Sequence, residues 1–254
     1  MNKKRLRVIE LIATILIFLA IVVWYHIVSI NKSLDAVLFP PIKVIINSFL
    51  QDKDKLIPNL LQSIQLLIPS IVLTLAIALV VGSILGLNKV ARDSVSPFLY
   101  ALSCVPSILL STIVMQLAPS LWWGAVILII YECVWSILFA TITGVQSIDK
   151  RYIESAETLK LNKVDTFFKV ILPAASPTIM GAFVNSLRSA FTILVYAETY
   201  SLSAYGLGNY VYTASKQGYW AKAWWGLIYM VIIVIIIMTI FEKLKDYILR
   251  WTID

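Results

Sequence analysis

The sequence predicts an all-α integral membrane protein, and two observations lead to this fold class. Of its 254 residues, 60% are hydrophobic and 14% are charged, whereas charged residues make up about a quarter of an ordinary soluble domain. A soluble fold of this size needs more polar surface, so most of the chain must face lipid. Apolar runs of about 20 residues also recur, which is the length at which a helix crosses the hydrocarbon core.

Six apolar runs predict six transmembrane helices within a single domain of residues 1–254. The first run is too long for a signal-peptide core and no small-residue cleavage site follows it, so we expect it to be retained. The predicted spans cover residues 8–30, 64–87, 97–117, 122–146, 174–197 and 223–241.

The charge distribution predicts how these spans are oriented. A net charge of +7 would suit nucleic-acid binding, but the basic residues flank the apolar runs instead. With both termini in the cytoplasm, fourteen Lys and Arg residues fall on the inner side and six on the outer side. This bias follows the positive-inside rule, and five tryptophans gather at the predicted outer boundaries, as an aromatic belt does.

Two local patterns predict departures from plain spans and loops. The stretch "FPPIKVIINSFLQD", residues 39–52, has apolar residues at i, i+3, i+4 and i+7. We expect a short amphipathic helix on the outer surface there. Pro69 and Pro106 fall inside spans, where each should kink its helix.

The sequence offers no metal or cofactor site. Cys104 and Cys133 both lie in apolar runs, so we interpret them as small buried hydrophobic residues rather than a disulfide or a metal site. A single histidine, His26, cannot form a metal site alone. We therefore expect no metal and no cofactor in this chain.

A charged segment, residues 148–173, separates the fourth and fifth spans. Asp149 can cap a first helix, and "LNK" offers a break near Asn162. A second helix then runs to Leu172 and ends before Pro173. Its apolar stripe requires a partner protein or, alternatively, a lipid surface; the stripe is formed by Val164, Phe167, Phe168 and Ile171.

This segment, "ESAETLK…VILPAASP", resembles the EAA loop of permease subunits of bacterial ABC importers. In that family a Glu-Ala-Ala start leads, after a glycine, to an Ile-x-Leu-Pro end. The matching residues are Glu154, Ala156, Val170, Leu172 and Pro173.

Two positions depart from that pattern. Ser155 replaces the first alanine, and Lys160 stands where the family glycine falls. A glycine there permits a turn with positive φ. Lysine must either turn with strain or move the break to Asn162, which tolerates the left-handed region.

The resemblance implies that the segment supplies the coupling helix that docks on a cytoplasmic ATPase. The sequence has no Walker signature, so ATP and Mg²⁺ would be bound by the partner chain, and this chain would be a transport subunit rather than an enzyme. The residues implied in ATPase coupling are Glu154, Ala156, Leu159, Val164, Phe167, Phe168, Val170, Leu172 and Pro173.

Four further stretches look like the nitrate/sulfonate/taurine-type branch of these MetI-like permeases: "LFPPIKVI", "NSLRSAF", "AETYSLSAYGLGNYV" and "LRW". The branch implies a five-helix core with one added N-terminal helix, in a bacterial inner membrane. It also implies a homodimer that works with ABC ATPase subunits and an extracytoplasmic substrate-binding protein. The implied substrate is a small organic or inorganic anion, such as a sulfonate, taurine or nitrate, or a vitamin-like heterocycle.

Two other classes of function agree less well with the sequence. A self-contained secondary transporter or channel would need intramembrane charges for ion coupling and would not need the charged segment. An intramembrane enzyme would need a catalytic or metal-ligand set, and the spans contain no such set.

The stretch "SAYGLGNYVYTAS", residues 203–215, follows the fifth span on the predicted outer side. Gly206 and Gly208 allow the chain to re-enter tightly. We expect Gly206, Gly208 and Asn209 to belong to an outer gate that meets the binding protein. The alternative is an ordinary polar turn.

Glu132 and Arg188 are the two clearest charges at membrane depth. They fall about ten and nine residues from the predicted outer face, at depths of roughly 15 and 14 Å. A lone charge at this depth is costly, so each needs a partner or water. We predict an ion pair; the alternatives are that Arg188 is a pathway cation for an anionic substrate, or that each charge meets water or backbone separately.

Overall fold

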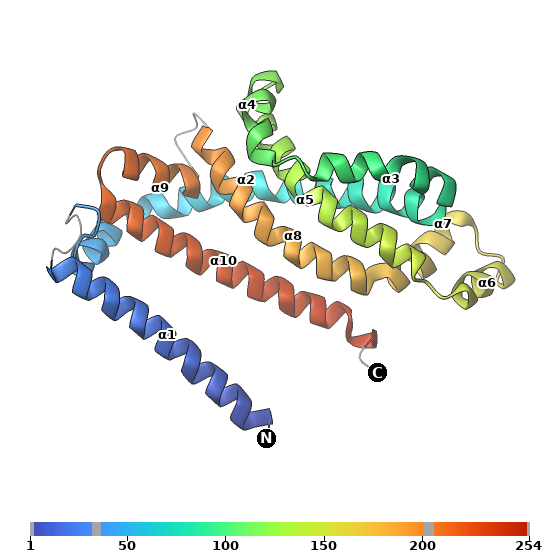
Figure 1. Cartoon of the computed structure of the whole chain (residues 1–254), viewed down its shortest axis with the longest axis horizontal. Coiled ribbons are helices and arrows are strands. Elements are labelled where there is room, and N and C mark those ends of the chain that lie inside the picture. The colour runs from blue at the N-terminus through green and yellow to red at the C-terminus, as the bar shows by residue number, and fades with distance from the viewer. Residues whose placement is uncertain (1–2, 32–36, 201–205, 253–254) are drawn as a thin grey trace. The chain divides into compact units, whose positions relative to one another are not determined.

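The computed structural model describes residues 3–31, 37–200 and 206–252, which contain helices and no strand (Figure 1). Two compact units make up the chain. The first unit contains residues 1–57 and 210–229, and the second contains residues 58–209 and 230–254.

Among the described residues, five helices are long and apolar enough to cross a membrane. They are α1 (Lys3–Asn31), α2 (Ile42–Leu87), α5 (Leu121–Gln146), α8 (Leu172–Tyr200) and α10 (Trp220–Ile248). The pair α3 (Lys89–Ser103) and α4 (Ser107–Leu117) makes a sixth span if it is counted as one helix bent by 91°. The predicted all-α membrane fold is confirmed, and the count of six depends on this bent pair.

Short helices connect the long ones. Between α5 and α8 lie α6 (Lys150–Thr158), α7 (Lys163–Thr166) and the π-helical turn η1 (Phe167–Ile171). Between α8 and α10 lies α9 (Leu207–Lys216), and the chain ends with the 3-10 turn η2 (Arg250–Thr252).

Helix α2 corrects one expectation. The segment expected to be a separate amphipathic helix is the first part of this 46-residue helix, which continues through Pro58 and Pro69. A proline inside a helix removes one hydrogen bond and its ring crowds the preceding turn, and packing along a long helix can compensate for this cost. Pro106 instead lies at a true break, because it adopts an extended conformation at the start of α4.

Helices α5 and α8 run side by side and form the core of the second unit (Figure 1). The Cys133 thiol donates to the Ser186 carbonyl, and the Ser186 hydroxyl donates back to the Cys133 carbonyl at 2.9 Å. Cys133 is buried as expected, but Cys104 is exposed because it lies at the α3–α4 break. Both thiols are free.

Two glycines one helical turn apart allow α2 to approach α5 closely. A Cβ atom at Gly82 would lie 2.7 Å from the Thr141 Cβ, and one at Gly86 would lie 2.7 Å from the Val145 Cβ. Small residues at this spacing let membrane helices pack at short range, where dispersion forces replace the missing hydrophobic drive.

Aromatic packing holds the first unit together. Tyr25 on α1 donates to the carbonyl of Pro40 at 2.8 Å, and the Trp224 indole of α10 donates to the carbonyl of Leu38 at 2.8 Å. The Tyr25 and Trp224 rings meet edge to face, 5.3 Å apart. Their polar ends thus satisfy carbonyls that precede the first turn of α2.

Candidate functional site

The predicted cap at Asp149 is confirmed, and Asn162, where a break is expected, caps the next helix. The Asp149 side chain accepts a hydrogen bond from the Arg151 backbone at 3.0 Å and caps α6. The Asn162 side chain accepts from the Asp165 backbone at 2.8 Å and caps α7. Short polar side chains at these positions satisfy N–H groups that a helix start leaves unpaired.

Lys160 takes the strained alternative. Its φ is +50°, and it follows Leu159, the C-cap residue of α6. The Lys160 N–H bonds to the Glu157 carbonyl and the Leu161 N–H bonds to the Ala156 carbonyl. This is the Schellman pattern that closes many helices, with lysine where glycine is usual. The break therefore stays at the position of the family glycine.

Pro173 does not stop the second helix, which corrects a second expectation. The chain runs from α7 through the π-helical turn directly into α8, with Pro173 in the first turn of α8. The Leu172 N–H reaches back to the Phe167 carbonyl in the wider π register. This wider turn, directly before the proline, relieves the clash that its ring would cause in a regular helix.

The apolar stripe of this segment divides into an exposed part and a buried part. Leu159 is 71% exposed, and Val164 and Phe168 are similarly open, at 65% and 60%. Phe167 and Ile171 instead pack against the core of the chain. The described residues therefore leave most of these three large apolar side chains uncovered, which is the property expected of a docking surface.

Ala156 behaves differently from the expectation that it meets the ATPase directly. Its side chain is only 2% exposed, whereas Glu154 on the same helix is exposed. Ala156 lines an open pocket of about 290 Å³ together with Val170, Pro173 and Trp251. Its small size lets α6 lie close to the base of α8, and Trp251 connects the "LRW" stretch to the same place.

A buried carboxylate that the sequence does not predict organises the start of α9. Glu198 near the end of α8 is 3% exposed. It accepts hydrogen bonds from the Ser63 hydroxyl at 2.5 Å and the Gly208 N–H at 2.6 Å, and a third from the backbone of Asn209. Two of the donors belong to the first turn of α9, where free N–H groups and the helix dipole favour an anion.

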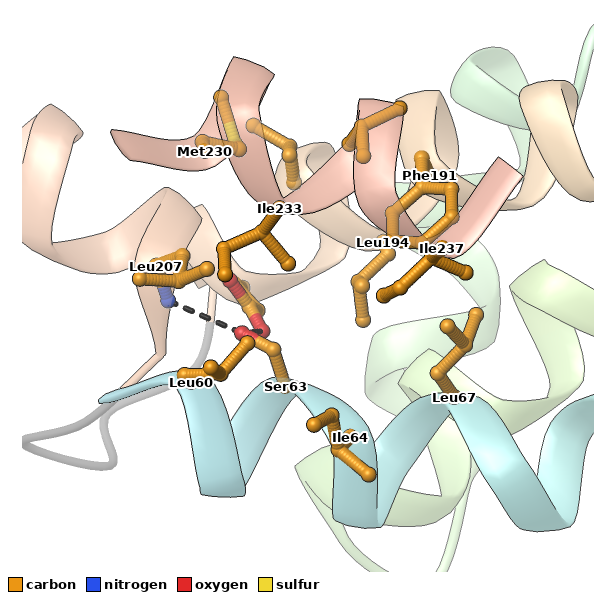
Figure 2. A pocket seen from close by; sticks show the side chains of 13 residues that line it. Leu60, Ser63, Ile64, Leu67, Phe191, Leu194, Leu207, Met230, Ile233 and Ile237 are labelled. Atoms are coloured by element: carbon orange, nitrogen blue, oxygen red, sulfur yellow. Dashed lines mark hydrogen bonds between the residues drawn. The ribbon is translucent and has the colours of Figure 1, made fainter. Parts of the chain in front are cut away.

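Two side chains of α2 complete this network. Asn59 accepts from the Gly206 N–H at 2.7 Å, and Ser63 accepts from the Leu207 N–H at 3.0 Å. Figure 2 shows Ser63 between α2 and the start of α9, beside a narrow cavity whose lining is apolar apart from Ser63 and Glu198. The first turn of α9 is thereby tied to both α2 and α8.

The expected gate residues lie inside this network. Gly206 and Gly208 are buried, and Asn209 is half-buried. Gly206 has a φ of +131°, and a Cβ at Gly208 would lie 2.6 Å from the Val195 carbonyl oxygen. Both glycines are therefore required by geometry. Residues 203–205 of the predicted loop lie outside the described residues.

A second acidic residue, Asp52, anchors α9 within the first unit. It bonds to Lys222 at 2.8 Å and Lys55 at 3.1 Å, and accepts from the Tyr210 hydroxyl at 3.2 Å. Burial and the negative charge of Asp52 raise the pKa of Tyr210, so its phenol keeps the proton that it donates.

Glu132 and Arg188 do not form the predicted pair. Arg188 bonds to Glu242 of α10 at 3.2 Å and to Asn185 at 3.1 Å. Glu132 accepts instead from the Ser107 hydroxyl at 2.5 Å. Equal depth brings two residues into contact only when their helix faces also meet, and here the faces of α5 and α8 that carry them do not.

The two missed acids share one sequence signal. Glu198 and Glu242 each lie one residue beyond the predicted end of a span, at residues 197 and 241. The helices continue past these ends, so a carboxylate that seems to be outside the membrane segment is part of the same helix. An acid that directly follows an apolar run is therefore a candidate for a partner on another helix.

Comparison with known proteins agrees with this architecture. The nitrate import permease protein NrtB of Leptolyngbya laminosa is 27% identical over 54% of this chain and 49% of its own length. The bicarbonate transport system permease protein CmpB of Synechococcus elongatus is 25% identical over 68% of this chain and 63% of its own length. The matched stretch thus spans about half to three-fifths of these relatives.

A solved structure has the same fold. The inward-facing MetNI methionine ABC transporter contains a chain that matches 79% of this one and 97% of itself, with a TM-score of 0.62 at 18% identity. The sequence profile described as "Binding-protein-dependent transport system inner membrane component" matches residues 75–254. The chain therefore belongs to the family of binding-protein-dependent transport system inner membrane components.

Proposed function

We propose that this chain is the permease subunit of an ABC importer and that residues 148–173 couple it to a separate cytoplasmic ATPase. The observation that carries the proposal is the exposed apolar surface of Leu159, Val164 and Phe168 on short, well-capped helices. The same apolar side chains could instead lie on a lipid surface. We favour the ATPase as their partner because a permease subunit of an importer needs a surface on which the ATPase can act.

The route of coupling follows from the continuous helix. Because α7 and η1 run into α8 without a break, movement of the docking surface is transmitted to α8 as to a rigid rod. The far end of α8 holds Glu198 and, through it, the first turn of α9. A displacement at one end of α8 can thus loosen or tighten the gate residues at the other end.

The remaining partners follow from the same proposal. ATP and Mg²⁺ belong to the ATPase chain, two copies of the permease form the pathway, and an extracytoplasmic binding protein delivers the substrate. The chain spans a bacterial inner membrane with both termini in the cytoplasm. The nitrate and bicarbonate permeases among the relatives favour a small anion of that kind as the substrate; a sulfonate, taurine or a vitamin-like heterocycle is the alternative.

The test changes the docking surface without touching the helix core. Phe168→Asp in the purified permease should abolish co-purification with its ATPase and the stimulation of ATP hydrolysis, because a charge replaces the exposed ring. Phe168→Leu, the matched control, should retain both. Unchanged assembly and stimulation in Phe168→Asp would overturn the proposal, and a self-contained transporter would then be favoured.

A further inference from the structure

The break between α3 and α4 opens a pocket of about 410 Å³ against α5. Its lining includes Ser107, Tyr131, Glu132 and Trp135, with Cys104 at the break itself. The Tyr131 hydroxyl donates to the Leu102 carbonyl, near the end of α3, at 2.6 Å. The pocket is thus built around a carboxylate, aromatic rings and the ends of two helices.

The Glu132 carboxylate can accept further hydrogen bonds. Ser107 bonds to the Oε2 atom of Glu132. Within the described part of the chain, no ion pair involves Glu132 and no hydrogen bond reaches its Oε1 atom. The side chain is half-buried and lines the open pocket, so Oε1 is available to a ligand.

The depth of this pocket shows that it cannot face lipid. Glu132 lies eleven residues after the start of α5, or about 17 Å along a 1.5 Å rise per residue. A carboxylate and interrupted helix ends at this depth are tolerated only where they line water or protein. Discontinuous membrane helices commonly form substrate sites for this reason.

The lining chemistry selects by charge. The ten lining residues include one acid and no base. An inorganic anion would therefore meet a negative charge with no cation to offset it. An organic cation would instead meet the free oxygen of Glu132 and the ring faces of Tyr131 and Trp135, which attract positive charge. These two rings pack edge to face, 5.4 Å apart.

We propose that this pocket is a substrate site of the translocation pathway and that it takes a solute with a positively charged nitrogen group. The inference rests on the proposed function, because it assumes that the chain forms a pathway. It departs from the anionic substrates of the relatives, and it concerns a face of α5 that is separate from the docking surface.

Cys104 provides a natural probe of this site. It is exposed in the pocket, whereas Cys133 is buried. In lipid nanodiscs, the full-length chain is labelled with trimethylammonium-ethyl or sulfonatoethyl methanethiosulfonate, and each rate is divided by the rate with a free thiol. The cationic reagent should label Cys104 about tenfold faster than the anionic one, and Cys104→Ser should remove the labelling.

Protection by solutes then tests recognition. Choline or N-methylpyridinium should slow the labelling of Cys104 at millimolar concentration, whereas nitrate and bicarbonate at equal ionic strength should not. Glu132→Gln should raise the half-protecting cation concentration about tenfold. Glu132→Asp should retain protection, and so should Ser107→Ala, which removes the internal hydrogen bond but leaves the charge.

The outcomes separate the two proposals. The cation site would be overturned if the anions protected Cys104, or if none of the solutes did. It would also be overturned if the cations protected Cys104 in Glu132→Gln as well as they do in the unchanged chain. The labelling requires no ATPase, so its failure leaves the docking proposal standing. Conversely, Phe168→Asp can fail to uncouple while Cys104 is still protected by cations.

Discussion

Glu198 of α8 accepts a 2.5 Å hydrogen bond from Ser63 of α2, although 135 positions separate them in the chain. The same Ser63 oxygen accepts from the Leu207 N–H at the start of α9. One hydroxyl thereby links three helices in the second unit. Since both residues are buried, the loss of either partner leaves polar groups unsatisfied in a nonpolar surrounding.

Replacement of the carboxylate should destabilise the hydrogen-bond network at the start of α9. Glu198→Gln keeps the shape but puts an NH₂ group opposite one of the donors, so the free energy of unfolding should fall by about 1–3 kcal/mol. Thermal unfolding in detergent measures this loss. Ser94→Ala, which removes only an exposed hydroxyl bonded within its own helix, is the control and should leave the midpoint unchanged. An equal midpoint for both variants would contradict the assigned role of Glu198.

Gly208 should tolerate no side chain. A Cβ there would lie 2.6 Å from the Val195 carbonyl oxygen and 2.9 Å from the Glu198 carboxylate. Gly208→Ala should therefore cost about 1–3 kcal/mol, the usual range for overpacking. Gly181→Ala on α8 is the matched control because nothing lies within 4 Å of its added Cβ; it should be neutral or slightly stabilising. If both changes are harmless, the close packing of α9 on α8 is wrong.

The sequence predicted features whose causes are local. The cap at Asp149, the helix break near Asn162 and the interruption at Pro106 depend on residues a few positions away. The partners of Glu198 and Arg188 could not be derived in this way, because they come from α2 and α10 and depend on how helix faces meet. Span ends were placed where hydropathy falls, and both missed acids lie just beyond those ends.

Replacement of Lys160 by glycine, the residue that the family has at this position, should stabilise the chain. Its φ of +50° costs a residue with a side chain about 1–2 kcal/mol, which glycine would avoid. Glycine gives back about 0.5–1 kcal/mol of this stabilisation, because it has more conformational freedom in the unfolded chain. Lys160→Gly should thus raise the free energy of unfolding by about 0.5–1 kcal/mol. Lys160→Val should lower it, since a β-branched residue resists positive φ. The opposite order in thermal unfolding would show that the turn is not strained.

Arg188 and Glu242 should be energetically coupled. Their side chains are 59% and 49% exposed within this chain, so screening limits the coupling to about 0.5–1 kcal/mol. A double-mutant cycle with Arg188→Met and Glu242→Gln measures this energy. The same cycle with Arg188→Met and Glu132→Gln is the control and should be additive. Coupling in the second cycle alone would restore the pair predicted from the sequence.

The most direct test of the account is a crosslink from the docking surface to the ATPase. In a Cys104→Ser, Cys133→Ser background, cysteine is placed at Val164, which is exposed, or at Ala156, which is buried. The co-expressed ATPase should crosslink to Val164→Cys in native membranes, and Ala156→Cys should react weakly. A chain that crosslinks to the ATPase at other positions, but never at residues 159, 164 or 168, would contradict the coupling role of this segment.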